Sequence, residues 1–337
     1  MLNFEQFEQY VNDHVQEYLA PELENAKVNL QIVEKNNGKQ LHAIVIREEG
    51  SAIAPTIYLE GYFQEYKDGL PIEEVLGNIA KLASNNRGND YLNVIEQFRD
   101  FDNIKDQVVM SVVNAQKNEK FLESVPHTMK EDLAIIYKVR VGSDEQGVAT
   151  VTLKQDLMDR WGISLEELHN CAMENSKRLL PVTVKSLGDV IMEMMINEGA
   201  PEEFVESLKE DTMGPSAQMF VITNRESLNG AASIMYSDAL KDLSEKLGTD
   251  LFVLPSSIHE VLAISTDVAD AETFADMVKA VNDEQVAMEE QLSDHVYRYD
   301  AKNDTLKLAD VTIEEIKRQA EADNHTDEEV SSHRRSR

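Results

Sequence analysis

The spacing of hydrophobic residues over the first 88 positions predicts a helix, three strands and a second helix. Five hydrophobic residues recur at helical spacing before a proline: Phe4, Phe7, Val11, Val15 and Leu19. Two strand-like runs, KVNLQIVEK and KQLHAIVIRE, flank Asn37-Gly38, which favours a hairpin because both residues tolerate positive φ. A third extended run, APTIYLEGY, precedes a helix over PIEEVLGNIAKLASNN.

The middle of the chain mixes strand and helix patterns. We expect a strand over DQVVMSVVNA, a short helix over NEKFLESVP and a hairpin of DLAIIYKVRVG with GVATVTLK. Gly162 and Pro181 end two further helices. In SLGDVIMEMMINEG, four apolar residues have the spacing of a helix face that packs on a core: Val190, Ile191, Met194 and Met195.

Short elements alternate from Met219 onward. MFVITNR and NGAASIMY are predicted strands, SDALKDLSEKLG is a helix stopped by Gly248, and LFVLPSSIHEVLAIS supplies two strands around a corner. Asp270 caps a helix over DAETFADMVKAVN, and HVYRYD pairs with TLKLAD in a closing hairpin. The polar sequence beyond is expected to be disordered after at most one frayed helix.

These patterns predict an α+β protein with small mixed sheets and packed helices in two or three subdomains. At 337 residues the chain is too long for one ordinary core. We expect an N-terminal α+β unit over 1–88, a mixed middle region over 89–215, a C-terminal α+β unit over 216–309 and a disordered tail over 310–337.

Charge and cysteine content narrow the possible functions. The formal net charge is −31, so most of the surface repels nucleic-acid phosphates and anionic lipids, and neither direct nucleic-acid binding nor a membrane partner is expected. No apolar run approaches the roughly 18 residues of a spanning helix, and the first residues do not resemble a secretory signal. Cys171 is the only cysteine, which excludes an intramolecular disulfide and a multi-thiolate metal site. A cytoplasmic location is expected.

The corner LPSSIHEVL holds the catalytic candidates, which are Ser256, Ser257, His259 and Glu260. A serine nucleophile with His259 as general base would make the protein hydrolase-like. The G-x-S-x-G turn is missing, however, and on a strand Glu260 would point away from His259. The favoured interpretation is a strand-to-strand corner whose polar groups bond to the backbone.

Asn224 and Arg225, in TNRESLNGAAS, are the candidate binding residues. A guanidinium beside an amide could hold a carboxylate or phosphate, although a structural role at the strand end is favoured. The histidines show no metal-ligand spacing and no phosphate loop occurs, so neither a metal nor a cofactor is predicted. Tyr58, Tyr62 and Tyr66 are four residues apart, but we expect that region to be extended and the spacing to be coincidental.

Several stretches resemble an uncharacterised bacterial family, a domain-of-unknown-function group of Firmicutes. They are PTIYLEGYFQEYKDG, WGISLEEL, LLPVTVKSLGDVI, FVITNRESLNGAASIMY, LFVLPSSIHEVLAI and LSDHVYRYD, which span nearly the whole chain except the tail. The resemblance implies a bacterial cytosolic protein and assigns no role to any residue.

The sequence therefore favours a non-catalytic binding or regulatory protein with a protein or small-molecule partner. Two alternatives stay open. One is a hydrolase-like enzyme that uses the Ser-Ser-x-His-Glu corner. The other is an acidic mimic of nucleic acid that occupies a DNA- or RNA-binding protein.

Overall fold

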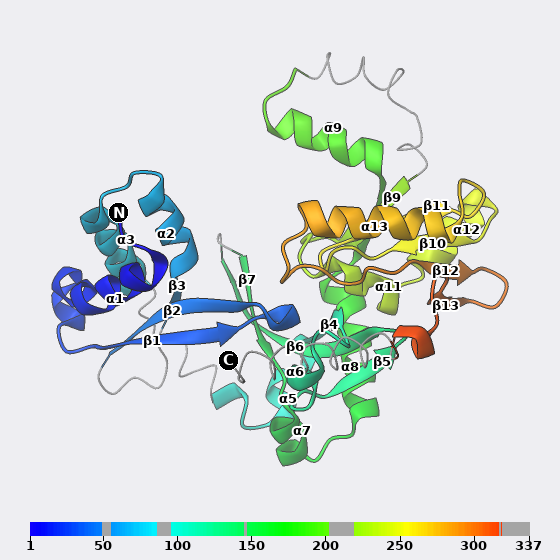
Figure 1. Ribbon diagram of the computed structural model, residues 1–337. Helices are drawn as coiled ribbons and strands as arrows, with labels where there is room; N and C mark the ends of the chain where they lie inside the picture. Colours follow the sequence, from blue (N-terminus) through cyan, green and yellow to red (C-terminus); the bar gives the residue numbers. More distant parts are fainter. Residues whose placement is uncertain (49–54, 86–95, 145–146, 202–218, 317, 319–337) are drawn as a thin grey trace, which may run out of the picture. The chain divides into compact units, whose positions relative to one another are not determined.

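The computed structural model describes residues 1–48, 55–85, 96–144, 147–201, 219–316 and 318. The chain forms two compact units, Met1–Arg99 and Asp100–Arg337 (Figure 1). Both combine helices with antiparallel sheets, so the α+β class is confirmed. Most of the predicted tail lies outside the described residues.

In the described part of the N-terminal unit, helices pack against a three-stranded antiparallel sheet of order β1-β2-β3. Its elements are α1 (Phe4–His14), β1 (Lys27–Glu34), β2 (Gln40–Arg47), β3 (Thr56–Tyr58), α2 (Leu59–Lys67) and α3 (Ile72–Asn85). Asn37 and Gly38 have φ angles of 58° and 70°, which confirms the turn predicted between β1 and β2. The core gathers fully buried side chains from each layer, including Phe7, Ile44, Leu59 and Ile79.

The predicted third strand is too long. The chain leaves the extended conformation at Leu59 and enters α2, so Tyr62 and Tyr66 lie on a helix. Both rings pack against the core, and the Tyr66 hydroxyl accepts a hydrogen bond from the Leu2 amide at 3.0 Å. The interpretation of the tyrosine spacing as coincidental was therefore wrong, because Tyr62 and Tyr66 share the inner face of α2.

The first sheet of the C-terminal unit centres on one long strand. The elements in this part are α5 (Phe101–Ile104), β4 (Val108–Asn114), α6 (Glu119–Leu122), β5 (His127–Lys130), β6 (Leu133–Asp144), β7 (Gly147–Thr152), α7 (Gln155–Trp161) and α8 (Leu165–Leu179). Strand β6 pairs with β4, β5 and β7, all antiparallel. Gly162 ends α7 with a φ of 69°, as expected of a left-handed stop.

Helix α8 covers the open edge of β4. The Ser176 hydroxyl accepts the Met110 amide at 2.9 Å, and the Asn175 side chain donates to the Val108 carbonyl at 3.0 Å. The thiol of Cys171, on the same helix, donates to the Lys105 carbonyl at 3.0 Å, and burial raises its pKa. The lone cysteine therefore helps to attach α8 to the segment before β4.

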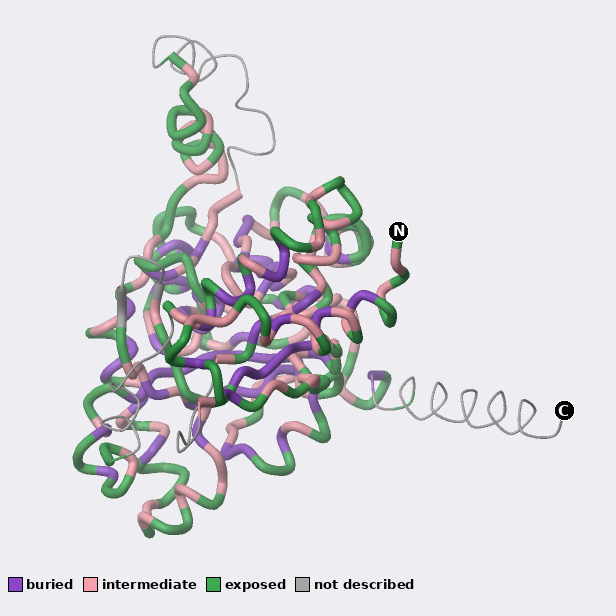
Figure 2. Tube along the Cα trace, turned by 90° about the vertical axis from the view of Figure 1, so that its left-hand side faces the viewer, coloured by how far each residue is buried: buried purple, intermediate pink, exposed green. Residues whose placement is uncertain are grey.

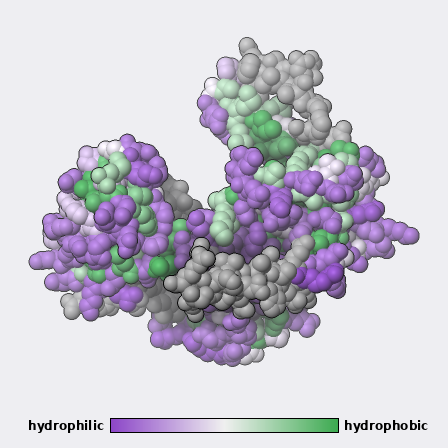
Figure 3. Space-filling view, viewed as in Figure 1, coloured by the Kyte–Doolittle hydropathy of each residue, from purple (hydrophilic) through white to green (hydrophobic). Residues whose placement is uncertain are grey.

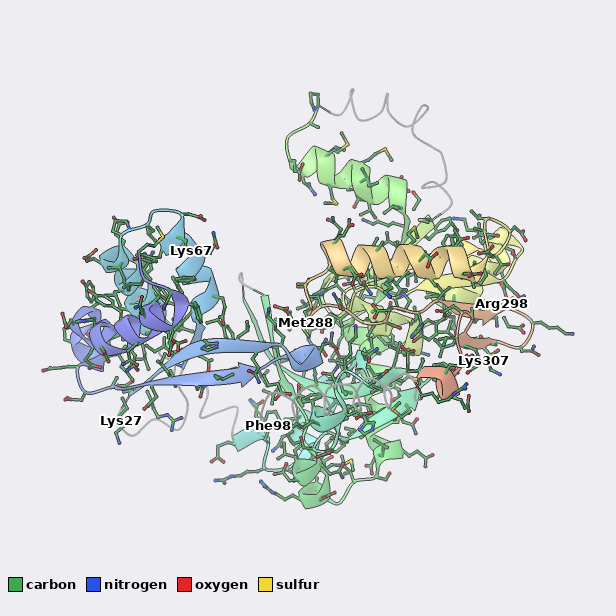
Figure 4. All side chains as sticks on the ribbon, viewed as in Figure 1. Lys27, Lys67, Phe98, Met288, Arg298 and Lys307 are labelled. Atoms are coloured by element: carbon green, nitrogen blue, oxygen red, sulfur yellow. The ribbon has the colours of Figure 1, made fainter. Side chains whose placement is uncertain are left out.

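The second sheet of this unit has six strands in the order β13-β12-β10-β11-β9-β8, each antiparallel to its neighbours. The elements in this part of the chain are β8 (Val182–Ser186), α9 (Leu187–Asn197), β9 (Met219–Asn224), α11 (Ser233–Tyr236), α12 (Ala239–Leu247), β10 (Leu251–Leu254), β11 (Val261–Ser265), α13 (Ala271–Gln285), β12 (Tyr297–Asp300) and β13 (Thr305–Leu308). Phe274 and Val278 of α13 pack on Phe252 and Ile264, so this helix covers one face (Figure 1). At the β12–β13 edge, Arg298 and Lys307 are register partners (Figure 4).

Two further predictions in this unit were wrong. NGAASIMY is not a strand, because Gly230–Ala232 forms a 3-10 turn that continues into α11. Helix α9 exists, but none of its residues is buried, and Ile191 and Met194 are 44% and 57% exposed (Figures 2 and 3). Periodicity established the helix but could not show that its apolar residues stay exposed.

A buried carboxylate joins the two sheets of the C-terminal unit. Asp132, in the turn between β5 and β6, is 6% exposed and accepts hydrogen bonds from the hydroxyls of Tyr297 and Ser293. Burial and then the charge of Asp132 raise the pKa of Tyr297, which keeps its hydroxyl protonated as a donor. The Asn114 side chain adds a second link by donating to the Leu292 carbonyl at 3.0 Å.

Within the described residues, no helix combines the length and apolar character needed to cross a bilayer.

Replacing Tyr297 by Phe is expected to destabilise the protein by about 1–3 kcal/mol, because the buried Asp132 carboxylate loses a donor. Tyr299→Phe is the matched control on the same strand, since its hydroxyl binds Asp304 at an exposed turn. Urea unfolding followed by circular dichroism measures both. If Tyr299→Phe lowered the free energy of unfolding as much as Tyr297→Phe or more, Asp132 would not be the link between the two sheets.

Candidate functional site

The serine-histidine corner connects β10 to β11 and lies beside residues 290–293. The Ile258 amide donates to the Glu290 carbonyl at 2.8 Å, and the Leu292 amide donates to the Ser256 carbonyl at 3.0 Å. Ser257 is 5% exposed, and its hydroxyl oxygen accepts the His259 amide at 2.9 Å. Ser257 also opposes the rise in the pKa of Glu260 that burial causes. Ser257 is thus held by its own turn.

The His259 ring turns toward the loop after β9. Its Nδ1 accepts the Asn229 amide at 3.3 Å, and its Nε2 lies 3.5 Å from Glu290 Oε1. Among the described residues, no hydrogen bond joins this ring to Ser256 or Ser257. Because Nδ1 accepts a backbone amide, it is Nε2 that faces the Glu290 carboxylate.

Gly230 allows the two candidate regions to meet. The Thr223 hydroxyl donates to the His259 carbonyl at 2.7 Å, and the Ala231 amide donates to the Ile258 carbonyl at 3.2 Å. A Cβ at Gly230 would collide with the Thr223 hydroxyl and lie 2.5 Å from the His259 oxygen. The loop after β9 and the corner before β11 therefore pack at backbone distance, which only glycine permits here.

Asn224 and Arg225 are adjacent in sequence but differ in environment. Asn224 is 1% exposed. Its side chain donates a hydrogen bond to the Leu228 carbonyl and accepts one from the Glu226 amide, both at 2.9 Å. Arg225 is exposed, and its backbone amide donates to the Pro181 carbonyl. The ion pair in this region instead joins Arg140 of β6 to Glu226 at 2.8 Å. The Asn224 amide therefore serves to close its loop.

Lys138 is a second polar side chain of β6 that contacts this loop. Its ammonium lies 3.3 Å from the Asn229 side-chain oxygen, which also accepts the Ser111 hydroxyl at 3.3 Å. Burial lowers the pKa of Lys138. Together with the Arg140–Glu226 pair, this contact ties the loop after β9 to the first sheet.

A pocket of about 350 Å³ opens elsewhere in the C-terminal unit, where β5 and β6 meet α8, α11, α12 and the β12–β13 hairpin. Its wall combines apolar and polar side chains: Thr128, Met129, Lys130, Ile135, His169, Ile234, Met235, Ser237, Asp238, Leu240, Lys241, Tyr299, Asp304 and Leu306. The volume lies in the lower range of small-molecule sites.

A chain of hydrogen bonds runs through the wall of this pocket. The Thr128 hydroxyl lies 2.7 Å from the Tyr137 hydroxyl, which lies 2.9 Å from His169 Nδ1. Burial raises the pKa of Tyr137, against the smaller lowering effect of the Thr128 bond, and burial lowers the pKa of His169. Both groups are therefore uncharged near neutral pH.

Sequence analysis did not single out this chain. His169 follows the buried Leu168 and lies one turn before the buried Ala172, so its position on the inner face of α8 could have been inferred. Its proximity to Tyr137 could not, because the two residues lie on different elements that meet only in the folded chain. Among the described residues, no group of three His, Cys, Asp or Glu side chains is arranged to hold a metal ion.

Comparison with known proteins identifies the family of the chain. A model of DUF5688, a family of unknown function, matches residues 4–301. The chain belongs to this family. This match confirms that the sequence resembles a domain of unknown function that spans nearly the whole chain. No curated protein and no solved structure matches the chain.

Gly230→Ala is expected to destabilise the protein by about 1–3 kcal/mol, because the added methyl group must push the corner and the loop apart. Gly188→Ala in α9 is the control, since the nearest atom to its Cβ would be the Ser186 hydroxyl oxygen, 3.9 Å away. We expect the control to change stability by less than about 1 kcal/mol. Thermal unfolding measures the stability of both variants. Comparable losses of stability in the two would refute the close packing at Gly230.

Glu260 predicts a pH dependence of stability. Burial raises its pKa above the ordinary 4.5, with Glu290 adding to the rise and His259 and Ser257 opposing it. The stability that protonation of Glu260 contributes is present below about pH 4.5 and is lost as pH rises through the folded pKa. Glu260→Gln mimics the protonated form, so it should unfold at higher urea than the parent at pH 7. The difference should vanish near pH 4, and a difference that persists there would refute the raised pKa.

Proposed function

We propose that this protein is a non-catalytic binding protein that holds a small molecule in the pocket between β5, α8 and α12. The observation that carries this proposal is the pocket itself, which combines apolar walls with a hydrogen-bond chain. Apolar and polar side chains share its wall about equally, so a molecule with both kinds of surface could be held there.

The hydrogen bonds at the serine-histidine corner also support a binding function. A serine nucleophile needs a base within hydrogen-bond reach, yet the Ser257 oxygen accepts the His259 backbone amide, and no hydrogen bond among the described residues joins it to the His259 ring. The His259 ring bonds to the Asn229 amide on one side and faces Glu290 on the other. These groups stabilise the turn, and the pocket lies on other elements.

We further propose that the protein acts in the bacterial cytoplasm. The resemblance to a Firmicute family supports this location. The single cysteine agrees with it, because a domain stabilised by disulfides would need pairs of cysteines.

Filling the pocket tests the proposal. Met129 lines the pocket from β5 and is 53% exposed, so Met129→Trp should block the site without a folding penalty. Val151→Trp is the matched control on β7 of the same sheet, 38% exposed and not part of the pocket wall. The probes are para-cresol, para-methylbenzylamine and para-toluate, which share one apolar ring and carry a neutral, cationic or anionic head.

Saturation-transfer NMR and titration calorimetry should show binding of at least one probe to the parent and to Val151→Trp. Met129→Trp should weaken that binding by about tenfold or more, the equivalent of about 1.4 kcal/mol. Absence of binding by all three probes would refute the proposal, as would equal binding by both tryptophan variants.

A further inference from the structure

The position of His169 determines which part of its ring a ligand can contact. Its Nδ1 is bonded to Tyr137, which is fully buried, while the residue itself contributes to the pocket wall. The ring nitrogen on the side away from Tyr137 is Nε2, and no hydrogen bond to it occurs among the described residues. Nε2 is therefore the nitrogen of the His169 ring that is left for a ligand.

The chain can present Nε2 in two ways. If Tyr137 donates to Nδ1, then Nε2 carries the proton and donates to the ligand. If Nδ1 carries the proton and donates to Tyr137, then Tyr137 donates to Thr128 and Nε2 accepts. A hydroxyl group, which both donates and accepts, matches either arrangement, whereas a carboxylate matches only the first and an ammonium only the second.

The charges around the pocket do not favour an ion of either sign. Lys130 and Lys241 contribute two positive charges, and Asp238 and Asp304 contribute two negative charges. The Asp304 carboxylate already accepts the Tyr299 hydroxyl at 2.6 Å. With His169 neutral, the formal charges of the wall sum to zero, so the wall does not attract an ion of one sign over the other.

Apolar residues provide a surface for the rest of the ligand. Ile135 and Leu240 are buried and Ile234 is half-buried, and the three come from the strand β6 and the helices α12 and α11. They line the same pocket as His169, so one molecule could contact both types of wall. A ligand with an apolar body and one polar end fits this division.

We propose that the pocket binds a small molecule with an uncharged hydroxyl group, a phenol or an alcohol, which hydrogen-bonds to Nε2 of His169 while its apolar body packs against Ile135, Ile234 and Leu240. This inference rests on the proposed function and adds the class of ligand and the residue that selects it.

Two variants of His169 separate its contact with Tyr137 through Nδ1 from its proposed contact with a ligand through Nε2. Asparagine retains a polar group near Nδ1 but removes the one at Nε2, whereas glutamine places an amide near Nε2. Para-cresol should bind the parent more tightly than para-toluate or para-methylbenzylamine does. His169→Asn should weaken para-cresol binding about five- to tenfold, as expected for one hydrogen bond, and His169→Gln should retain most of the affinity. Circular dichroism and thermal unfolding verify that both variants fold.

The outcomes distinguish this inference from the proposed function. If one or more probes bind and Met129→Trp blocks them, but an ionic probe binds most tightly, the pocket is a binding site and the inference about its ligand is wrong. Equal para-cresol affinity in the parent and folded His169→Asn would also overturn it. If no probe binds, the proposed function itself fails. If His169→Asn does not fold, His169→Gln and Tyr137→Phe test the role of His169 instead. Tyr137→Phe should weaken para-cresol binding, because it removes the partner that orients the His169 ring, and unchanged para-cresol affinity in Tyr137→Phe would overturn the inference.

Discussion

The hydrogen bonds to the buried carboxylate of Asp132 fix the two sheets of the C-terminal unit against each other, and the pocket depends on them. Asp132 belongs to the β5–β6 turn, and its partners Ser293 and Tyr297 belong to the segment that enters β12. Lys130 and Tyr299, each two residues from this link, line the pocket. A carboxylate that loses its donors in an apolar interior is costly, so this contact holds the sheets at one separation. The pocket is the space that remains where the facing layers do not touch.

The polar residues at the other junction between elements have a different role. Near Gly230, the hydroxyl of Thr223, the amide of Asn229 and the ring of His259 bond to one another or to nearby backbone. Each bond satisfies a group that the turn would otherwise leave unpaired. This explains why a motif rich in serine, histidine and glutamate can lack the contacts of a catalytic site: the same side chains that perform chemistry also satisfy buried backbone groups. Their density in sequence does not distinguish the two roles, whereas their hydrogen-bond partners do.

The sequence predicted those parts of the fold that local chemistry determines. The Asn37-Gly38 turn, the left-handed stops at Gly162 and Gly248 and the cap at Asp270 depend on a few neighbouring residues, and all four are present. Strand β8, which was not predicted, depends on pairing with β9, and the turn at Gly230–Ala232 depends on contact with the corner at His259. Helix α2 is an intermediate case. Its apolar residues Leu59, Tyr62, Phe63 and Tyr66 have helical spacing, but the strand before it obscured the start. The pocket lies between seven elements, β5, β6, α8, α11, α12, β12 and β13, so no local sequence pattern could predict it.

The charge of the whole chain and the charge of the pocket support different conclusions. A net charge of −31 describes a surface that repels phosphates over long distances, and it bears on which macromolecules can approach. The pocket wall has balanced charges, and its inner polar atoms belong to neutral groups that burial keeps neutral. Since salt screens exposed charges beyond about 10 Å, the distant acidic surface has little effect on a ligand in the pocket. In the proposed binding function, selection therefore depends on the hydrogen-bonding capacity of His169 and on the shape of the apolar part of the wall. An acidic protein can for this reason bind a neutral molecule rather than a cation.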